Sequence, residues 1–159
     1  VCHRDVKGGN ALVSCDGVVK LADFGASKMF GKDTMADVMK SMKGSVFWMA
    51  PEVLHGPQGP GYNEKADIWS LGCTVIEMLT GKHPWPQLNN QMAAMYQIAH
   101  NKEGPPRPDN ASPLALDFLN KCLQFDSADR PSAAELLQHP FVASAEVPRS
   151  RGAGAGLGL

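Results

Sequence analysis

The segment from residue 62 to residue 80 restricts the folds open to this chain more than any other stretch. Six apolar residues recur in it close to the 3.6-residue period of an α-helix: Ile68, Leu71, Val75, Ile76, Met78 and Leu79. Gly81 follows where a glycine commonly ends a helix. We therefore expect a buried central helix, on which Asp67 would be costly to bury unless it accepts hydrogen bonds.

A small β-hairpin and further helices are expected around this central helix. Residues 11–13 and 18–21 form two short runs rich in β-branched residues, and the Asp16-Gly17 pair between them is a strong hairpin-turn signal. Further helices are predicted over residues 91–99, 113–123 and 132–138. The fold class is therefore expected to be mainly α with one small β-hairpin.

The composition is typical of a soluble globular protein. The 159 residues are 43% hydrophobic, enough for one sizeable core, and the net charge of −1 gives no electrostatic case for binding nucleic acid or an anionic membrane. No apolar run approaches the roughly 20 residues of a membrane-spanning helix, and the N-terminus lacks a signal-peptide pattern. Four scattered cysteines indicate free thiols in a reducing compartment. We expect a cytoplasmic protein without nucleic-acid or membrane partners.

Residues able to carry chemistry are concentrated in the loop 3–10 and at Asp23. Asp5, Lys7 and Asn10 place a carboxylate, an ammonium group and a carboxamide on this one loop. Phosphoryl transfer uses such groups, because the protein must supply a base, a positive charge and hard oxygen ligands for Mg²⁺. The predicted hairpin begins after Asn10 and ends before Asp23, so it would bring these two candidate metal ligands side by side. The sequence therefore predicts a phosphoryl-transfer site.

Three motifs, in the same order, resemble those of the eukaryotic protein kinases. They are HRDVKGGN over residues 3–10, DFG over residues 23–25 and APE over residues 50–52. Shorter family-like pieces lie at residues 67–72, 128–131 and 139–141. The resemblance covers residues 1–142 and implies a partial C-terminal lobe of the α+β kinase fold, from the catalytic loop to the last helix. Residues 143–159 are rich in Gly and Ala, and we expect a flexible tail there.

The resemblance assigns a role to each polar residue of the loop. Asp5 would orient a substrate hydroxyl and accept its proton, and Lys7 would neutralise charge on the γ-phosphoryl group of ATP. Asn10 and Asp23 would bind Mg²⁺ and, together with Lys7, the nucleotide. A lysine two residues after the catalytic aspartate is typical of serine/threonine kinases. The implied activity is transfer of the ATP γ-phosphoryl group to a protein Ser or Thr hydroxyl.

Residues 26–49 lack a periodic pattern and resemble the activation segment of kinases. Ser41 stands where related kinases commonly carry the activating phosphate, and Thr34 is the alternative phosphosite. Arg4, together with Lys28, would pair with that phosphate. The segment is therefore expected to regulate activity through phosphorylation.

The end of this segment resembles the wall of the substrate pocket that holds the residue after the phosphorylated one. The wall consists of Ser45, Val46, Phe47 and Trp48. In serine/threonine kinases a hydroxyl at the first of these positions touches both the catalytic aspartate and the nearby lysine, here Asp5 and Lys7. We therefore expect Ser45 to have a structural rather than a regulatory role.

Two contacts are expected to hold the framework of the site. By resemblance, Asp67 accepts hydrogen bonds from the backbone of the His-Arg-Asp turn and so fixes the catalytic loop. Glu52 would pair with Arg130 and tie the end of the activation segment to the C-terminal helices. Breaking that pair would leave a partly buried charge unpaired.

A narrower likeness concerns the sequence GSVFWMAPE over residues 44–52 and the ASK that follows the DFG glycine. Both resemble the kinases that activate mitogen-activated protein kinase kinases. The likeness implies that such a kinase is the protein substrate and that an upstream kinase is the activator.

The sequence begins two residues before the His-Arg-Asp triplet and holds neither a Gly-rich phosphate loop nor a Val-Ala-Ile-Lys strand. We therefore expect these 159 residues to be inactive on their own. The alternative function is a non-catalytic, pseudokinase-like binding or regulatory fragment. A metal-dependent phosphatase or nuclease is disfavoured, because neither explains the APE motif and the helical half of the chain.

We expect phosphate on Ser41 to activate the full-length enzyme, because charge-assisted hydrogen bonds to Arg4 and Lys28 would order the substrate pocket. Ser41→Ala should therefore abolish activation by the upstream kinase. The measurement is phosphotransfer activity before and after treatment with that activator, with Thr34→Ala in parallel. Retained activation in Ser41→Ala, alongside its loss in Thr34→Ala, would move the switch to Thr34.

Overall fold

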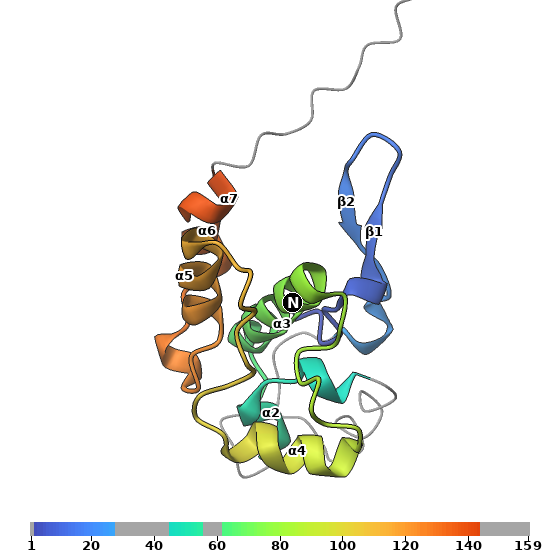
Figure 1. Cartoon of the computed structure of the whole chain (residues 1–159). Coiled ribbons are helices and arrows are strands. Elements are labelled where there is room, and N and C mark those ends of the chain that lie inside the picture. Colours follow the sequence, from blue (N-terminus) through green and yellow to red (C-terminus); the bar gives the residue numbers. More distant parts are fainter. Residues whose placement is uncertain (1, 28–44, 56–61, 144–159) are drawn as a thin grey trace, which may run out of the picture.

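The computed structural model describes residues 2–27, 45–55 and 62–143 (Figure 1). Its elements, with η denoting a 3₁₀-helix, are η1 (Gly8–Asn10), β1 (Ala11–Val13), β2 (Val19–Leu21), η2 (Phe24–Ala26), η3 (Val46–Trp48), α2 (Pro51–Leu54), α3 (Glu64–Thr80), α4 (Gln91–His100), α5 (Pro113–Cys122), η5 (Ser127–Asp129), α6 (Ala133–Leu137) and α7 (Pro140–Ala143). The expectation of a mainly α fold with one small β-hairpin is confirmed.

Helix α3 lies in the middle of the molecule, between the hairpin on one side and α5 to α7 on the other (Figure 1). Asn63 caps its start by accepting a hydrogen bond from the Lys65 backbone, and Gly81 ends it with a left-handed φ of 68°. Nearly every turn of α3 is buried, and Trp69 and Cys73 have no exposed surface. The helix therefore forms the centre of the core, as its apolar period predicts, although Met78 near its end is 68% exposed.

The hairpin connects the predicted catalytic loop, residues 3–10, to Asp23, and both lie at its open end. β1 and β2 pair antiparallel, with Ala11 opposite Leu21, and the backbone N–H of Ala22 donates to the carbonyl of Asn10 at 2.9 Å. This last bond closes the open end of the hairpin. Asn10 is therefore one member of a hydrogen-bonded pair and Asp23 directly follows the other member, although the two are 13 positions apart in sequence.

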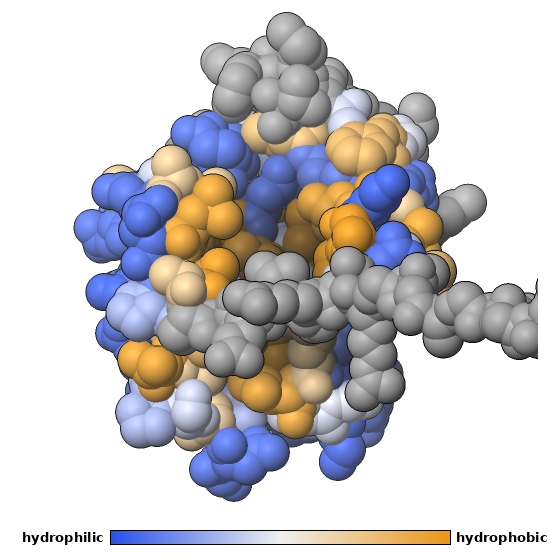
Figure 2. Space-filling model, turned by 90° about the horizontal axis from the view of Figure 1, so that it is seen from above, coloured by the Kyte–Doolittle hydropathy of each residue, from blue (hydrophilic) through white to orange (hydrophobic). Residues whose placement is uncertain are grey.

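Apolar side chains of the hairpin face solvent in this structure. Those with large exposed surface are Leu12, Val13, Val18, Val19 and Leu21. Figure 2 views the molecule from the end that carries the hairpin and shows apolar side chains gathered around a hollow. Single exposed apolar residues are normal on protein surfaces, whereas a group of this size is a surface suited to contact with other protein.

Glu52 and Arg130 form a buried ion pair that joins α2 to the loop before α6. Arg130 is 1% exposed and Glu52 is 5% exposed, and the two side chains make a bidentate contact with distances of 2.7 and 2.8 Å. The remaining guanidinium N–H groups donate to the backbone carbonyls of Lys65, Gln124 and Phe125. All N–H donors of Arg130 are therefore used, which offsets the cost of removing its charge from water.

The C-terminal end of the described chain packs through His139. The backbone N–H of Phe141 donates to His139 Nδ1 at 3.2 Å, so the ring hydrogen must be on Nε2, which lies 2.8 Å from an Asp117 carboxylate oxygen. The ring also meets Phe118 edge to face. These contacts hold α7 on α5. The predicted tail lies outside the described residues from residue 144 onward.

We expect Glu52→Ala to lower the free energy of unfolding by about 3–5 kcal/mol, because it leaves the buried Arg130 charge without its carboxylate. Urea denaturation of the protein measures this change. Glu103→Ala is the matched control, since Glu103 is exposed and its loss should cost less than about 0.5 kcal/mol. Equal effects of the two substitutions would show that the ion pair does not stabilise the fold.

Candidate active site

Asp67, in the first turn of α3, holds the backbone of the catalytic loop. Its Oδ2 accepts from the N–H of His3 at 2.7 Å, and its Oδ1 accepts from the N–H of Arg4 at 2.9 Å and from the hydroxyl of Tyr62 at 2.8 Å. Burial and the neighbouring Asp67 hold the pKa of Tyr62 well above its usual value, so its hydroxyl keeps the proton that it donates. These are the backbone contacts that the sequence leads us to expect for Asp67.

The loop needs this anchor because Arg4 has a left-handed backbone conformation. Its φ is 73°, a value that is uncommon for a residue with a side chain. The Arg4 guanidinium lies over the ring of Tyr62, 4.9 Å from its centroid. The bonds to Asp67 thus stabilise a local geometry that the loop sequence disfavours.

His3 joins the catalytic loop to the segment that contains Asp23. The backbone N–H of Asp5 donates to His3 Nδ1 at 3.3 Å, and His3 Nε2 lies 3.1 Å from the carbonyl of Ala22. The ring meets Phe24 edge to face at 4.7 Å, and Ser27 Oγ donates to the His3 carbonyl at 3.2 Å. Because Nδ1 accepts, Nε2 carries the hydrogen and donates. The ring of His3 therefore joins the loop of residues 3–10 to the segment that contains Asp23.

Asp5, Lys7, Asn10 and Ser45 form one hydrogen-bonded cluster. Asp5 Oδ2 accepts from Lys7 Nζ at 2.9 Å and from Asn10 Nδ2 at 2.8 Å. Lys7 Nζ also donates to Ser45 Oγ at 2.7 Å, and Asn10 Nδ2 donates to the Asp5 carbonyl at 2.8 Å. The other carboxylate oxygen, Asp5 Oδ1, is buried, and the described residues give it no regular hydrogen bond. One oxygen of Asp5 is therefore left for a further donor.

The charge state of Asp5 follows from competing effects on its pKa. Burial raises the pKa, but hydrogen bonds from Ser45, Lys7 and Asn10 and the positive charge of Lys7 together hold it below its usual value. The Ser45 hydroxyl accepts from Lys7, so its own hydrogen can point toward Asp5 even without a regular bond to Oδ1. Asp5 is therefore ionised at neutral pH and can accept a proton.

Asn10 and Asp23 offer hard oxygen atoms at the open end of the hairpin. Both amide hydrogens of Asn10 are directed at Asp5, which leaves the amide oxygen as an acceptor. Asp23 has a left-handed φ of 60° and an exposed side chain, one oxygen of which accepts from the Gly25 N–H at 3.2 Å. No set of three or more His, Cys, Asp or Glu side chains within the described ranges could hold a metal. A carboxylate and a carboxamide suit Mg²⁺ that is shared with nucleotide phosphates, and the residues fit that ion.

A polar stripe runs along the otherwise apolar helix α3, and sequence analysis missed most of it. Asp67, Ser70, Thr74 and Glu77 lie within an arc of about 80° at 100° per residue. Ser70 Oγ donates to the carbonyl of Trp48 at 2.8 Å. Glu77 contacts the loop and the same tryptophan. The signal that could have revealed the stripe is the spacing of polar residues at i, i+3, i+7 and i+10.

The expected wall of the substrate pocket, residues 45–48, contacts this polar stripe of α3 through Trp48. Ser45 and Val46 are buried, while Phe47 and Trp48 are partly exposed. The Phe47 ring stacks on His83, with centroids 4.2 Å apart and an angle of 27° between planes. The wall is thus packed between α3 and the segment that follows it.

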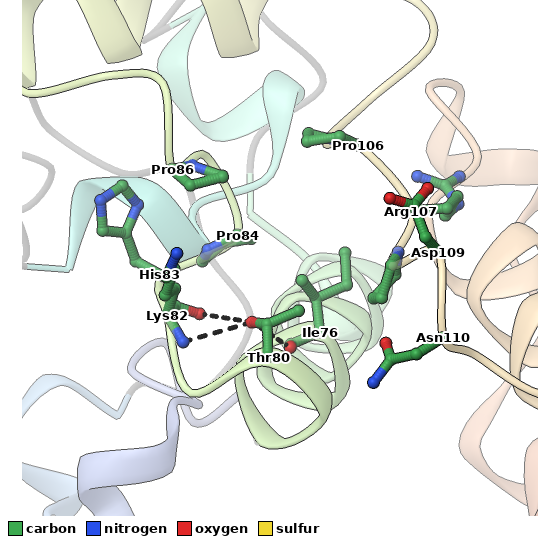
Figure 3. Close-up of a pocket in the computed structure, with 11 residues that line it drawn as sticks. Ile76, Thr80, Lys82, His83, Pro84, Pro86, Pro106, Arg107, Asp109 and Asn110 are labelled. Carbon is green, nitrogen blue, oxygen red and sulfur yellow. Dashed lines mark hydrogen bonds between the residues drawn. The ribbon is translucent and has the colours of Figure 1, made fainter.

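His83 also lines a cavity of about 400 Å³ (Figure 3). Figure 3 shows Lys82, His83, Pro84 and Pro86 on one side, Pro106, Arg107, Asp109 and Asn110 on the other, and Ile76 and Thr80 between them. No described residue of the catalytic loop lines it. The cavity is therefore separate from the Asp5 cluster.

The two expected phosphosites, Thr34 and Ser41, lie outside the described residues, as does Lys28. Arg4, the other expected phosphate partner, lies inside them. Sequence analysis did not single out His3, Tyr62 or Glu77 as site residues. Glu77 contacts a segment that is distant in sequence, and Tyr62 donates to nearby Asp67, whose carboxylate binds the distant loop. Only the folded chain reveals these contacts.

Comparison with known proteins identifies the class of this chain. The family model described as "Protein kinase domain" matches residues 1–142. The chain therefore belongs to the protein kinase family.

The most similar curated proteins reported below are all mitogen-activated protein kinase kinase kinases. Mitogen-activated protein kinase kinase kinase 2 of Arabidopsis thaliana is 54% identical over 142 residues, which are 89% of this chain and 21% of that protein. Mitogen-activated protein kinase kinase kinase ANP1 of the same plant is 53% identical, with the same coverage of both proteins. Mitogen-activated protein kinase kinase kinase 19 of Homo sapiens is 44% identical over 146 residues, covering 89% of this chain and 11% of that protein. The chain thus spans about a fifth of the length of its plant relatives.

We expect Lys7→Met to raise the pKa of Asp5. The substitution removes a hydrogen bond and a positive charge that favour the carboxylate, while burial continues to favour the neutral acid. The pH range in which Asp5 becomes protonated should therefore move upward. Titration of the Asp5 carboxyl carbon by NMR measures the shift, and Lys20→Met on the exposed hairpin is the control. An unchanged Asp5 titration in Lys7→Met would show that Lys7 does not set its charge state.

Proposed function

We propose that this chain is the catalytic-loop part of a serine/threonine protein kinase, which transfers the γ-phosphoryl group of ATP to a protein hydroxyl. The observation that supports this most directly is the Asp5 carboxylate. One of its oxygens is held by Lys7 and Asn10, and the other is buried without a regular hydrogen bond from the described residues. A carboxylate with one oxygen held in place and an unused acceptor on the other can receive a hydroxyl hydrogen once a substrate reaches it.

Asp5 acts as the base in this proposal. Oδ1 accepts the hydrogen of the substrate hydroxyl and so orients the nucleophilic oxygen toward the phosphoryl group. The lowered pKa of Asp5 keeps the carboxylate ionised before the reaction. Lys7 Nζ, which touches both Asp5 and Ser45, supplies positive charge beside the transferred group.

Asn10 and Asp23 are the residues proposed to hold Mg²⁺. When bound, the ion neutralises negative charge on the nucleotide phosphates. The hairpin fixes the separation of its two ligands, and His3 links their segments through Asp5 and Ala22. ATP and Mg²⁺ are accordingly the proposed cofactors.

The contact of Lys7 with Ser45 supports Ser and Thr as the phosphorylated residues. It joins the catalytic loop to the proposed wall of residues 45–48, which would hold the substrate residue after the phosphorylated one. On this proposal Ser45 orders the pocket and is not itself the regulatory phosphosite.

The cascade position is the finer part of the proposal. The names of the relatives describe mitogen-activated protein kinase kinase kinases. We infer that the substrate is a mitogen-activated protein kinase kinase and that an upstream kinase phosphorylates Ser41 or Thr34, with Arg4 and Lys28 as phosphate partners. The proposed location is the cytoplasm. No helix in the described parts of the chain has the length and apolar character to cross a membrane.

In the full-length protein, Asp5→Asn should lower phosphotransfer roughly a hundredfold or more while the fold persists, because it removes only the base. Asp23→Ala should weaken Mg-ATP binding as well as turnover. The measurements are phosphorylation of a recombinant mitogen-activated protein kinase kinase and calorimetric titration with Mg-ATP. Full activity of Asp5→Asn would refute the assignment. A wild-type protein that binds its partner but transfers no phosphate would favour the pseudokinase-like alternative.

A further inference from the structure

The cavity of about 400 Å³ beside His83 takes no part in the proposed chemistry (Figure 3). Its volume is in the range of ligand pockets, roughly 300–1,000 Å³. Its apolar walls are contributed by Ile76 and by four prolines, Pro84, Pro86, Pro106 and Pro108. A proline ring fixes φ and has no backbone N–H, so these walls are stiff and offer few backbone donors. The cavity is therefore preformed, and its walls suit an apolar side chain of a ligand.

The polar part of the lining includes two cations and one acid: Lys82, Arg107 and Asp109. Within the described ranges, no carboxylate forms an ion pair with either cation. When His83 is counted as neutral, the lining therefore has an excess of positive charge. Such a lining favours an acidic group on the ligand.

Arg107 is held in place for such a group. Its Nε donates to Asn120 Oδ1 at 3.0 Å, and its Nη1 donates to the carbonyl of Pro105. The third nitrogen, Nη2, makes no hydrogen bond to a described residue and is not buried. Burial lowers the pKa of the Arg107 guanidinium, and no carboxylate in the described parts of the chain offsets this loss of water around the charge. A ligand carboxylate would supply the missing partner.

The cavity adjoins the proposed substrate wall through His83. The His83 ring lines the cavity and also stacks on Phe47, with centroids 4.2 Å apart. A substrate segment bound at the wall of residues 45–48 can therefore extend past this ring into the cavity. We propose that the cavity is a docking subsite for the protein substrate, where it takes an acidic side chain with an apolar neighbour. The inference rests on the proposed kinase function, which supplies both the substrate and the wall.

A segment of the protein substrate fits the lining better than a free inorganic anion. An inorganic anion would leave Ile76 and the proline rings in contact with water, whereas an apolar side chain covers them. Docking at a second place also raises the effective concentration of the substrate hydroxyl at Asp5. The expected signature is a lower KM for the whole protein substrate than for a short peptide that contains only its phosphorylated region.

Charge changes at exposed positions test the subsite without disturbing the core. Lys82 is exposed, and its side chain makes no hydrogen bond to a described residue, so Lys82→Glu should raise the KM for the protein substrate roughly threefold or more. Asp109→Asn removes the opposing charge and should lower the same KM. Lys102→Glu, at an exposed position outside the cavity, makes the same charge change as Lys82→Glu and is the matched control.

The test uses the full-length protein with two substrates, a recombinant mitogen-activated protein kinase kinase and a short peptide from its phosphorylated region. It compares kcat, the KM values for both substrates and for ATP, and the thermal unfolding midpoint among the wild type and the variants. Arg107→Gln is included and should resemble Lys82→Glu, with the unfolding midpoint reporting the loss of its bonds to Asn120 and Pro105. Calorimetric titration with the recombinant kinase kinase without ATP measures docking independently of phosphate transfer.

Each outcome decides between the explanations. A higher protein-substrate KM in Lys82→Glu and a lower one in Asp109→Asn support the inference, provided that the short-peptide KM and the Lys102→Glu control are unchanged. Unchanged KM and calorimetric affinity for the protein substrate in Lys82→Glu would overturn it, and a cavity that binds a small organic acid or another protein gives this result.

Equal increases of KM for the protein and for the short peptide would also overturn the inference, because they place the effect at the wall and not in a separate subsite. Absence of Asp5-dependent phosphotransfer to both substrates, with calorimetric binding that still depends on Lys82, would instead refute the proposed function. The two failures are therefore distinguishable.

Discussion

The structure depends on the need to satisfy polar groups on a buried helix. Asp67 would be costly inside the core without hydrogen bonds, and the backbone N–H groups of His3 and Arg4 supply them. The same bonds hold Arg4 in a backbone conformation that its own sequence disfavours. The core and the catalytic loop therefore stabilise each other, and neither arrangement is complete alone.

The elements built from local pattern could be predicted from the sequence. The apolar period before Gly81 predicted α3, and the Asp16-Gly17 turn predicted the hairpin whose ends bring Asn10 and Asp23 together. Capping residues later in the chain predicted α4 and α5 to within a residue at either end. In each case the residues that decide the structure are neighbours in sequence or one helical turn apart.

The contacts missed by sequence analysis have a different physical origin. The carboxylate of Glu77 meets the amide of Gly8 across a separation of 69 residues, and the Tyr62 hydroxyl donates to an Asp67 oxygen that already serves the loop. The Glu77 contact leaves no local pattern, because it depends on how two elements pack. The Tyr62 contact spans only five residues, but it completes a network whose other donors, His3 and Arg4, come from a distant segment. Glu77 and Ser70 do repeat the direction of Asp67 around the helix, so a search for polar stripes on apolar helices would find the positions, although not their partners.

The hairpin has a thermodynamic consequence for the proposed metal site. Each strand has three residues, and a two-stranded sheet of this size is only marginally stable in water. Its apolar side chains are largely exposed, so any protein surface that covers Leu12 and Val19 favours the ordered hairpin. Because the hairpin sets the separation of Asn10 and Asp23, such a surface would also favour metal binding. By linkage the effect is reciprocal: an ion held at the open end would tighten association at the apolar faces by the same free energy.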